Sequence, residues 1–270
     1  MFDINSLTFA LLAAVGWGTY FVPVKKQNNS YEIQAGIGIG AIIFSLISLL
    51  FYASLSINIY GIVAGIIWTT ANLSMIVAVR EIGLARATPL TGSIVIITSF
   101  LWGLLYFNEE LSSLFYALAG IIALIIAMQM IVVRKKEKSL YGYLFMTIAG
   151  ILWGSVFVPL KFTSFNDSYF SMSLTIFITS IVFIFKSNLK IILYGSISGV
   201  IWNMANLAGF IAIESLGLTI GYPLTQSAIL ISALWGVLYF KEINDNKQKQ
   251  RIFIGAIIII ISAILLALAL

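Results

Sequence analysis

The stretch WGTYFVPVK at residues 17–25 returns, slightly changed, as WGSVFVPLK at residues 153–161. Two more stretches recur in the same order: GIVAGIIWTTANL at 61–73 with GSISGVIWNMANL at 195–207, and LWGLLYFNEE at 101–110 with LWGVLYFKE at 234–242. The copies stay 133 to 136 residues apart. Self-similarity at a nearly constant offset is the signature of an internal structural repeat. We therefore expect the chain to consist of two copies of one unit.

Tryptophan and proline test this repeat more severely than the abundant apolar residues do. The chain has six tryptophans and four prolines, and every one of them has a partner near the repeat offset. The pairs are Trp17 with Trp153, Trp68 with Trp202, Trp102 with Trp235, Pro23 with Pro159, and Pro89 with Pro223. Chance similarity between apolar segments does not pair every member of two rare residue types.

The composition of the chain is that of a protein dissolved in lipid. Of its 270 residues, 61% are hydrophobic and 9% are charged, and the mean hydropathy is +1.06. Soluble domains carry about 25% charged residues, so this chain has too few to cover a surface in water. The absence of cysteine excludes disulfides and thiol chemistry, and the absence of histidine removes the commonest general base and metal ligand.

Ten windows of the sequence have the roughly 17–25 mostly apolar residues that a membrane-spanning helix needs. They are 7–24, 33–53, 59–79, 87–107, 113–133, 141–160, 169–185, 191–213, 218–240 and 252–270. The connectors are too short for a soluble domain, so we expect one all-α integral membrane domain. Its first five-helix repeat covers 1–134 and its second covers 139–270. Because five is an odd number, the second repeat is expected to be inverted in the membrane.

The basic residues are distributed as such an inverted repeat requires. The connectors after spans 1, 3, 5, 7 and 9 carry 14 of the 15 Lys and Arg residues, and the other side carries only Lys161. Basic connectors stay in the cytoplasm, so both termini are predicted to lie outside the cell membrane. Topology thus accounts for the net charge of +5, without nucleic acid as a partner. Lys161 is either a solute or anion contact at the outer mouth, or a copy of Lys25 that reaches the headgroups.

The acidic residues argue against an enzyme. All ten Asp and Glu residues lie near span ends or in connectors, and none lies at mid-membrane depth. A membrane hydrolase or transferase needs a nucleophile with a base, or a carboxylate and metal cluster. We therefore expect no catalytic residue, no metal and no cofactor. The lack of a mid-membrane acid also favours a facilitator or exchanger over proton coupling.

Aromatic and amide side chains recur together on the third and eighth spans. Trp68 and Asn72 are four residues apart and share a helix face, as do Trp202 and Asn206. An indole covers the apolar face of a neutral polyhydroxylated ligand, while an amide both donates and accepts hydrogen bonds. In the alternative interpretation the asparagines join helices and the indoles serve packing or interfaces. The candidate binding residues are Trp17, Trp68, Asn72, Trp153, Trp202, Asn203, Asn206 and Gln226.

Glycine and proline also recur at matching positions. The four-residue glycine spacing in spans 3 and 8 lets a helix approach its neighbour closely. Pro89 and Pro223 either break their helices beside a wet cavity or begin them, as proline does in a first turn. The candidate hinge or packing residues are Pro23, Gly61, Gly65, Pro89, Pro159, Gly195, Gly199 and Pro223.

Taken together, these motifs resemble a known group of transporters. The WG pair near the start of each half, G-x-x-x-G-x-x-W in spans 3 and 8, and the endings YFNEE and YFKE resemble the drug/metabolite transporter superfamily, and more narrowly its glucose/ribose porter family. FVPVKK at 21–26 is similar to eukaryotic relatives thought to carry carbohydrate. The resemblance covers essentially the whole chain and implies a central cavity between spans 1–4 and 6–9, with spans 5 and 10 peripheral. Termini outside the cell depart from the pattern of many superfamily members.

The sequence therefore predicts a secondary transporter that is a facilitator, an exchanger or a weakly coupled symporter. Its expected cargo is a small polar solute, a sugar first, moved by alternating access between the two halves. One alternative is an amino-acid or other metabolite exporter of the same superfamily, and another is a non-transporting receptor or assembly protein. The expected partners are the solute and the lipid bilayer, and a homodimer stays open.

Overall fold

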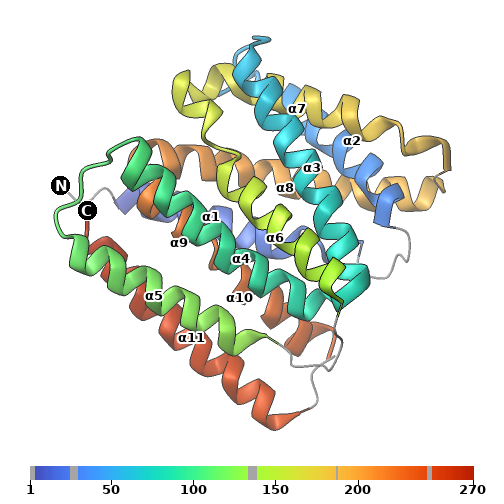
Figure 1. Ribbon diagram of the computed structural model, residues 1–270. Helices are drawn as coiled ribbons and strands as arrows, with labels where there is room; N and C mark the ends of the chain where they lie inside the picture. Colours follow the sequence, from blue (N-terminus) through green and yellow to red (C-terminus); the bar gives the residue numbers. More distant parts are fainter. Residues whose placement is uncertain (1–3, 25–29, 133–138, 187, 242–244) are drawn as a thin grey trace.

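The computed structural model describes residues 4–24, 30–132, 139–186, 188–241 and 245–270, which form helices and short connections without a β-strand (Figure 1). The first elements are α1 (Ile4–Thr19), α2 (Ser30–Ser48), α3 (Ile59–Ile82), α4 (Leu84–Leu101), the π-helix η1 (Trp102–Tyr106) and α5 (Leu114–Ile131). Next come α6 (Leu140–Ser155), the short helix η2 (Pro159–Phe162), α7 (Phe165–Ile181), the short helix η3 (Ile184–Lys186) and α8 (Leu189–Leu216). The last are η4 (Gly217–Gly221), α9 (Tyr222–Thr225), α10 (Ala228–Leu234), η5 (Trp235–Tyr239) and α11 (Asn246–Ala267).

Much of this helical structure is long and apolar enough to cross a bilayer. In the described part of the chain seven stretches qualify: Tyr31–Ser48, Ile59–Ile82, Arg86–Tyr106, Leu114–Ile131, Leu140–Phe162, Leu189–Tyr239 and Asn246–Ala267. Large apolar side chains such as Leu50, Phe115 and Phe185 lie on the outside, whereas many serine, threonine and asparagine side chains are buried. Helices satisfy their own backbone hydrogen bonds, so they suit a solvent that offers none. The chain is an all-α, multi-pass membrane protein, as predicted.

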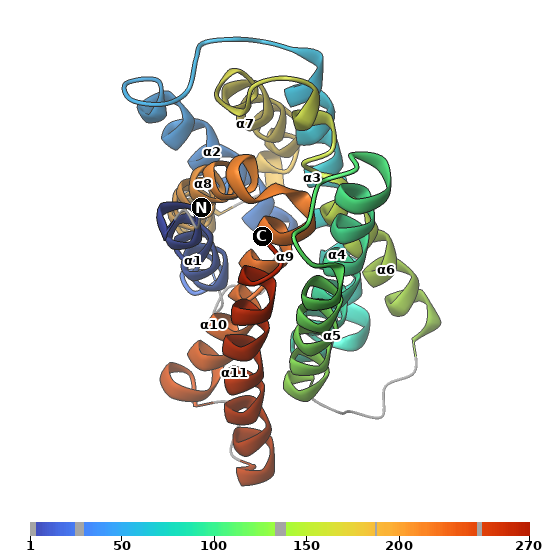
Figure 2. The ribbon, with the colours of Figure 1, turned by 90° about the vertical axis from the view of Figure 1, so that its left-hand side faces the viewer.

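The helices pack as a central bundle with one peripheral pair. Helix α8 packs against α1 and α2, while α3 packs against α6 and α7. Helix α4 lies against α6, and α1 lies against α10. Helices α5 and α11 lie side by side at the edge of the bundle (Figures 1 and 2). They contain the fifth and tenth predicted spans, for which the family resemblance implies a peripheral position.

Glycines permit the closest of these helix contacts. A Cβ atom added to Gly195 would lie 2.9 Å from the Cα of Gly36, so α8 and α2 touch through their backbones. A Cβ atom on Gly61 would lie 2.5 Å from the Cβ of Ser171, where α3 meets α7. Small residues let membrane helices approach this closely and gain van der Waals contact. Gly65 and Gly199 occupy corresponding places one turn further along the same two helices.

Two glycines with positive φ angles reverse the chain between consecutive helices. Gly83 (φ 82°) separates α3 from α4, and Gly217 (φ 74°) separates α8 from η4. The left-handed region is open to glycine without the steric penalty that a Cβ atom brings. The prolines that follow differ in position. Pro223 lies near the start of α9, whereas Pro89 lies inside α4, so the interpretation that the proline begins a helix is wrong for Pro89.

The ninth predicted span, 218–240, is not one regular α-helix. It consists of η4, α9, α10 and η5 in succession, and the two flanking segments are π-helical. Apolar composition over 23 residues predicts that a segment crosses the membrane, but it does not report how the backbone hydrogen bonds are arranged. Single-turn π-helical segments occur often at functional sites, where they place side chains off the regular helical register.

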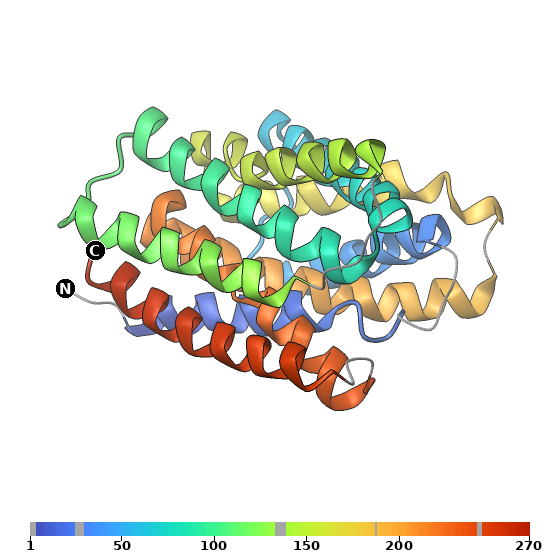
Figure 3. The ribbon, with the colours of Figure 1, turned by 60° about the horizontal axis from the view of Figure 1, so that its bottom comes forward.

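The helix ends define two faces of the molecule. We call the end at which α1 begins and α11 finishes the terminal face (Figure 3). Hydrogen bonds link several connections there: the Ser54 N–H donates to the Asn166 carbonyl, and the Ser112 N–H donates to the Ala269 carbonyl. We call the opposite end the basic face. It carries the described basic residues Arg80, Arg86, Lys190, Lys241, Lys247, Lys249 and Arg251.

Candidate functional site

A cavity lies in the middle of the bundle, between α1, α3, α4, α6, α8 and the α9–α10 segment. It leaves about 110 Å³ for the centres of water-sized molecules, and one water needs roughly 10–15 Å³ on that measure. The cavity therefore has room for a small solute. It reaches from Phe157 and Tyr222, toward the terminal face, to Tyr20 and Thr88, toward the basic face.

Aromatic side chains form most of the wall. Trp68 and Trp202, which are repeat partners, meet with ring centroids 4.2 Å apart, and each is only 4% exposed. The ring of Trp17 stands edge-on to Tyr222 at 6.1 Å and contacts Phe157 at 6.5 Å. Rings packed against one another in this way have few accessible orientations, so they offer a solute a rigid apolar surface.

The polar groups at the cavity are uncharged. Among the described residues that line it, the hydrogen-bonding side chains are those of Thr88, Thr91, Asn206, Gln226, Ser232, two tyrosines and the tryptophans, with no Asp, Glu, Lys or Arg. Such a site offers no carboxylate for an ammonium group and no cation for a phosphate. It fits a neutral polar solute, and these residues include no nucleophile–base pair. No group of His, Cys, Asp and Glu able to hold a metal ion occurs among the described residues.

Several polar atoms at the cavity have no partner within the described chain. The indole N–H groups of Trp17 and Trp153 and the hydroxyl of Thr88 are buried without a hydrogen bond. The side-chain nitrogen of Asn206 lies 4.0 Å from the sulfur of Met172, which is a weak contact. Buried polar groups in proteins almost always have a hydrogen-bond partner. The concentration of unpaired groups at this cavity therefore indicates that a polar ligand could bind there.

The structure brings most of the predicted binding residues together. Six of the eight line the cavity: Trp17, Trp68, Trp153, Trp202, Asn206 and Gln226. The other two do not line it and instead join helices. Asn72 donates to Gln34, which itself donates to Ser180 at 2.8 Å. Asn203 donates to the Ala41 carbonyl at 2.7 Å and to the Ser173 hydroxyl at 3.1 Å. For these two, the interhelical alternative describes the contacts found.

The sequence prediction missed several cavity residues. Thr88 and Tyr222 directly precede the paired prolines Pro89 and Pro223, and the two positions are repeat partners. Phe21 and Phe157 are likewise partners, within the repeated FVP motif. Their recurrence was a usable signal. Composition alone did not reveal it, because phenylalanine and tyrosine are as common in lipid-facing positions as in cavities.

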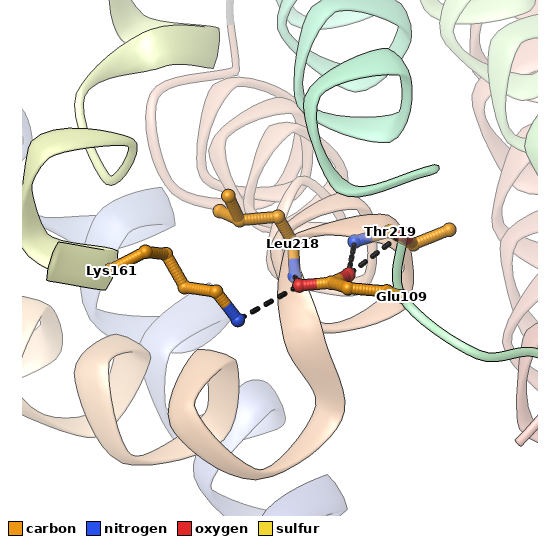
Figure 4. Close-up of polar contacts among 4 residues, drawn as sticks. All are labelled: Glu109, Lys161, Leu218 and Thr219. Carbon is orange, nitrogen blue, oxygen red and sulfur yellow. Dashed lines mark hydrogen bonds and ion pairs between the residues drawn. The ribbon is translucent and has the colours of Figure 1, made fainter. Parts of the chain in front are cut away.

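Lys161 takes part in a polar cluster at the terminal face, and neither sequence interpretation describes it (Figure 4). Its ammonium group lies 2.9 Å from Oε1 of Glu109. The same carboxylate accepts hydrogen bonds from the backbone N–H groups of Leu218 and Thr219. Burial raises the pKa of Glu109, but the Thr219 hydroxyl, these two N–H groups and Lys161 outweigh it and hold that pKa below its ordinary value. The carboxylate is therefore charged at neutral pH.

The fold and the cavity together define a class of protein: a multi-pass helical membrane protein with an uncharged, aromatic-walled cavity that has room for a small solute. A solved crystal structure shares the fold with a TM-score of 0.73, covering 96% of this chain and 95% of its own, at 14% identity. The chain belongs to the sugar transport protein family, whose model matches residues 8–269. The predicted kinship with the sugar porters is thereby confirmed.

Relatives in this family align with nearly the full chain. The glucose uptake protein GlcU of Bacillus subtilis (strain 168) is 28% identical, with 97% of this chain and 98% of the relative covered. A putative sugar uptake protein of Bacillus cereus (strain ATCC 10987) is 22% identical, with 97% and 98% covered. A probable glucose uptake protein GlcU of Staphylococcus aureus (strain MRSA252) is 23% identical, with 95% and 96% covered.

Proposed function

We propose that this protein carries a neutral sugar across the cell membrane as a secondary transporter. The observation that carries the proposal is the uncharged cavity at the centre of the bundle, walled by tryptophan and supplied with unpaired hydrogen-bonding groups. Family membership and the names of the relatives, which are uptake proteins for glucose or sugar, support the same cargo. The transporter is a facilitator, an exchanger or a weakly coupled symporter, because no acidic side chain lines the described cavity.

The binding mode follows from the chemistry of a pyranose. Its ring presents an apolar C–H face that an indole can cover, and its hydroxyls both donate and accept hydrogen bonds. In this proposal Trp68 and Trp202 form the platform, and the amides of Asn206 and Gln226 select hydroxyls. Trp17 and Trp153 donate their N–H groups when the solute settles between the halves. Asn72 and Asn203 hold neighbouring helices in place around the site.

The transport mechanism we propose is alternating access between two inverted five-helix repeats, 1–134 and 139–270. This requires ten spans, and helix lengths support that number. The 51-residue stretch Leu189–Tyr239 is about twice the length of one crossing and turns at Gly217. Helices α1 and α7, with 16 and 17 residues, are slightly shorter than the other candidates and complete the count.

Matching contacts between the halves support the inverted repeat. The indole N–H of Trp102 donates to the Ser155 hydroxyl at 2.9 Å. Its repeat partner Trp235 donates to Thr19, the partner of Ser155, at 3.0 Å. Each bond runs from one half to the other, so the two halves exchange equivalent interactions, as copies related by a two-fold axis do. In this mechanism the paired prolines serve as hinges. We further propose that the basic face is cytoplasmic, with both termini outside.

Counterflow in proteoliposomes tests this function. Vesicles loaded with one unlabelled sugar are followed for entry of labelled solute, across a panel of sugars and amino acids. We expect exchange of a neutral sugar, reduced at least about tenfold in Trp202→Ala/Asn206→Ala through weaker binding, which corresponds to about 1.4 kcal/mol. Met204→Ala lies on the same helix at a 52% exposed position and serves as the matched control.

Each other outcome of this experiment changes a specific part of the proposal. Exchange of an amino acid without exchange of any sugar contradicts the proposal that the cargo is a sugar and favours an exporter of the same superfamily. If folded protein exchanges none of the solutes, the result favours a receptor or assembly protein. Full sugar exchange in the double variant leaves the transport class standing but removes the α8 site.

A further inference from the structure

The carboxylate of Glu109 lies in a cradle built from both halves of the chain (Figure 4). Glu109 follows η1 in the first half. From the second half, Leu218 and Thr219 donate their backbone N–H groups at 2.9 and 2.8 Å, and the Thr219 hydroxyl donates at 2.7 Å. Lys161, in η2, adds the ion pair at 2.9 Å. Four donors thus converge on two oxygens.

The backbone around the carboxylate leaves room for it and for little else. A Cβ atom added to Gly217 would lie 2.5 Å from Oε2 of Glu109, and one added to Gly103 would lie 2.6 Å from the same atom. The two N–H donors belong to the first residues of the helical segment that starts at Gly217, where backbone N–H groups have no intrahelical partner. A negative group at that position also meets the positive end of the helix dipole.

This cluster lies one turn beyond the closed end of the cavity. Phe157 precedes Lys161 by four residues, and Tyr222 follows Thr219 by three. The rings of Phe157 and Tyr222 meet at 4.7 Å, and Phe157 packs against Phe210 at 5.3 Å. All three rings are buried. Phe157 and Tyr222 thus form a packed aromatic layer at the end of the cavity toward the terminal face, and the Glu109 cradle joins the backbone segments that carry them.

The geometry points to a latch: Glu109, with Lys161 and the N–H groups of Leu218 and Thr219, keeps the cavity closed toward the terminal face, and it must break before solute can pass there. This inference rests on the proposed alternating access. Movement of one half against the other separates η1 from η2 and η4, because η1 belongs to the first half and both η2 and η4 belong to the second. The side chains of Glu109 and Lys161 are 14% and 23% exposed, so water at this face can rehydrate both charges as they part.

Cysteine accessibility tests the latch without any solute. The chain has no cysteine, so Val156→Cys, at a buried position lining the cavity next to Phe157, gives a single reporter. Full-length protein in vesicles is treated with a small, charged, membrane-impermeant methanethiosulfonate applied from the terminal face. Leu55→Cys, at an exposed residue of that face, identifies the side of addition.

We expect Glu109→Gln to raise the labelling rate of the reporter by on the order of tenfold, because charge-assisted hydrogen bonds that favour the closed state are lost. Lys161→Met is expected to raise it as well, to a smaller extent. Glu110→Gln removes the neighbouring, exposed carboxylate and is expected to leave the rate unchanged. Thermal unfolding of each variant shows that it is folded.

Unchanged labelling in both Glu109→Gln and Lys161→Met, in protein that unfolds like the parent, would overturn the latch. An equal rise in Glu110→Gln would also overturn it, because the effect would then belong to loop charge in general. Labelling needs no cargo, so this result stands apart from counterflow. A working latch with no sugar exchange would contradict the cargo alone, and sugar exchange with unchanged labelling would contradict the latch alone.

Discussion

Asn72 and Asn206 show how two identical residues in matching positions acquire different surroundings. Each follows a tryptophan by four residues on a helix that crosses the centre of the bundle. The amide of Asn72 is directed to Gln34 of α2, whereas that of Asn206 lines the cavity with only a weak contact to Met172. The positions of α7 that lie 134 to 136 residues after Gln34 are Ser168, Tyr169 and Phe170, so no amide takes its place in the other half. A residue's role at this scale depends on which neighbour reaches it.

Asn203 and Asn206 give a prediction at this residue scale. Asn203→Ala removes the side-chain hydrogen bonds to the Ala41 carbonyl and the Ser173 hydroxyl, so we expect the free energy of unfolding to fall by about 0.5–2 kcal/mol. Solute affinity of the folded variant is expected to stay near that of the parent. Asn206→Ala is expected to do the opposite, with stability nearly unchanged and affinity reduced.

Thermal unfolding and equilibrium binding, measured on both variants, check this pair. The two positions lie on the same helix and lose the same atoms, so each variant controls for the other. Equal losses of affinity in both would mean that Asn203 acts on the site directly, and equal losses of stability would contradict the assignment of Asn206 to the cavity.

At the scale of elements, Gly83 and Gly217 form matching turns that have different surroundings. Both reverse the chain with a positive φ angle between consecutive helices, at matching places in the two repeats. Their surroundings differ. An added Cβ atom meets nothing within 4 Å at Gly83, but meets the Glu109 carboxylate at Gly217. The same turn is therefore only a turn in one half and part of the cradle in the other.

Substitution of the two glycines separates backbone strain from the latch. Gly83→Ala and Gly217→Ala both place a residue with a Cβ atom at a positive φ angle. We expect this strain to lower the free energy of unfolding by about 1 kcal/mol in each variant. Only Gly217→Ala also displaces the carboxylate, so only this variant is expected to speed labelling of Val156→Cys from the terminal face. Labelling in each background, beside thermal unfolding, checks the difference; equal labelling rates would contradict the cradle.

At the scale of the whole molecule, the terminal and basic faces carry the proposed orientation in the membrane. Helix α1 begins and α11 finishes at the same end of the bundle (Figure 3), which requires an even number of crossings. The described basic residues of the connectors, apart from Lys161, lie at the other end. In the positive-inside arrangement that we propose, the latch lies on the outer side, and the end of the cavity lined by Tyr20 and Thr88 lies toward the cytoplasm.

Membrane-impermeant maleimide applied to intact cells checks this orientation. We expect Leu55→Cys and Leu270→Cys, both exposed at the terminal face, to be labelled, and Lys247→Cys at the basic face to be protected until the membrane is permeabilised. The reverse labelling pattern would contradict the proposed orientation and place the basic face outside the cell. Labelling of Leu55 and Leu270 from different sides would contradict the ten-span proposal.

The sequence by itself determined that the chain spans a membrane with helices and that its motifs recur, and it singled out four of the tryptophans that line the cavity. These properties can be read without knowledge of the fold because they are local or periodic. Hydropathy is summed over about 20 consecutive residues, and the rare residues recur at a nearly constant offset. Six of the eight candidate binding residues line the cavity, and four of these six are tryptophans that pair across the repeat.

Only the tertiary structure decided which polar groups hydrogen-bond to neighbouring helices and which line the cavity without a partner. It alone showed that Glu109 contacts Leu218. These two residues are separated by 109 positions, and their contact depends on the reversal at Gly217 that exposes two N–H groups. Hydropathy places both near span ends and says nothing about which ends meet. Pairing between distant polar groups depends on how helices pack, and packing is decided by the whole set of neighbours at once.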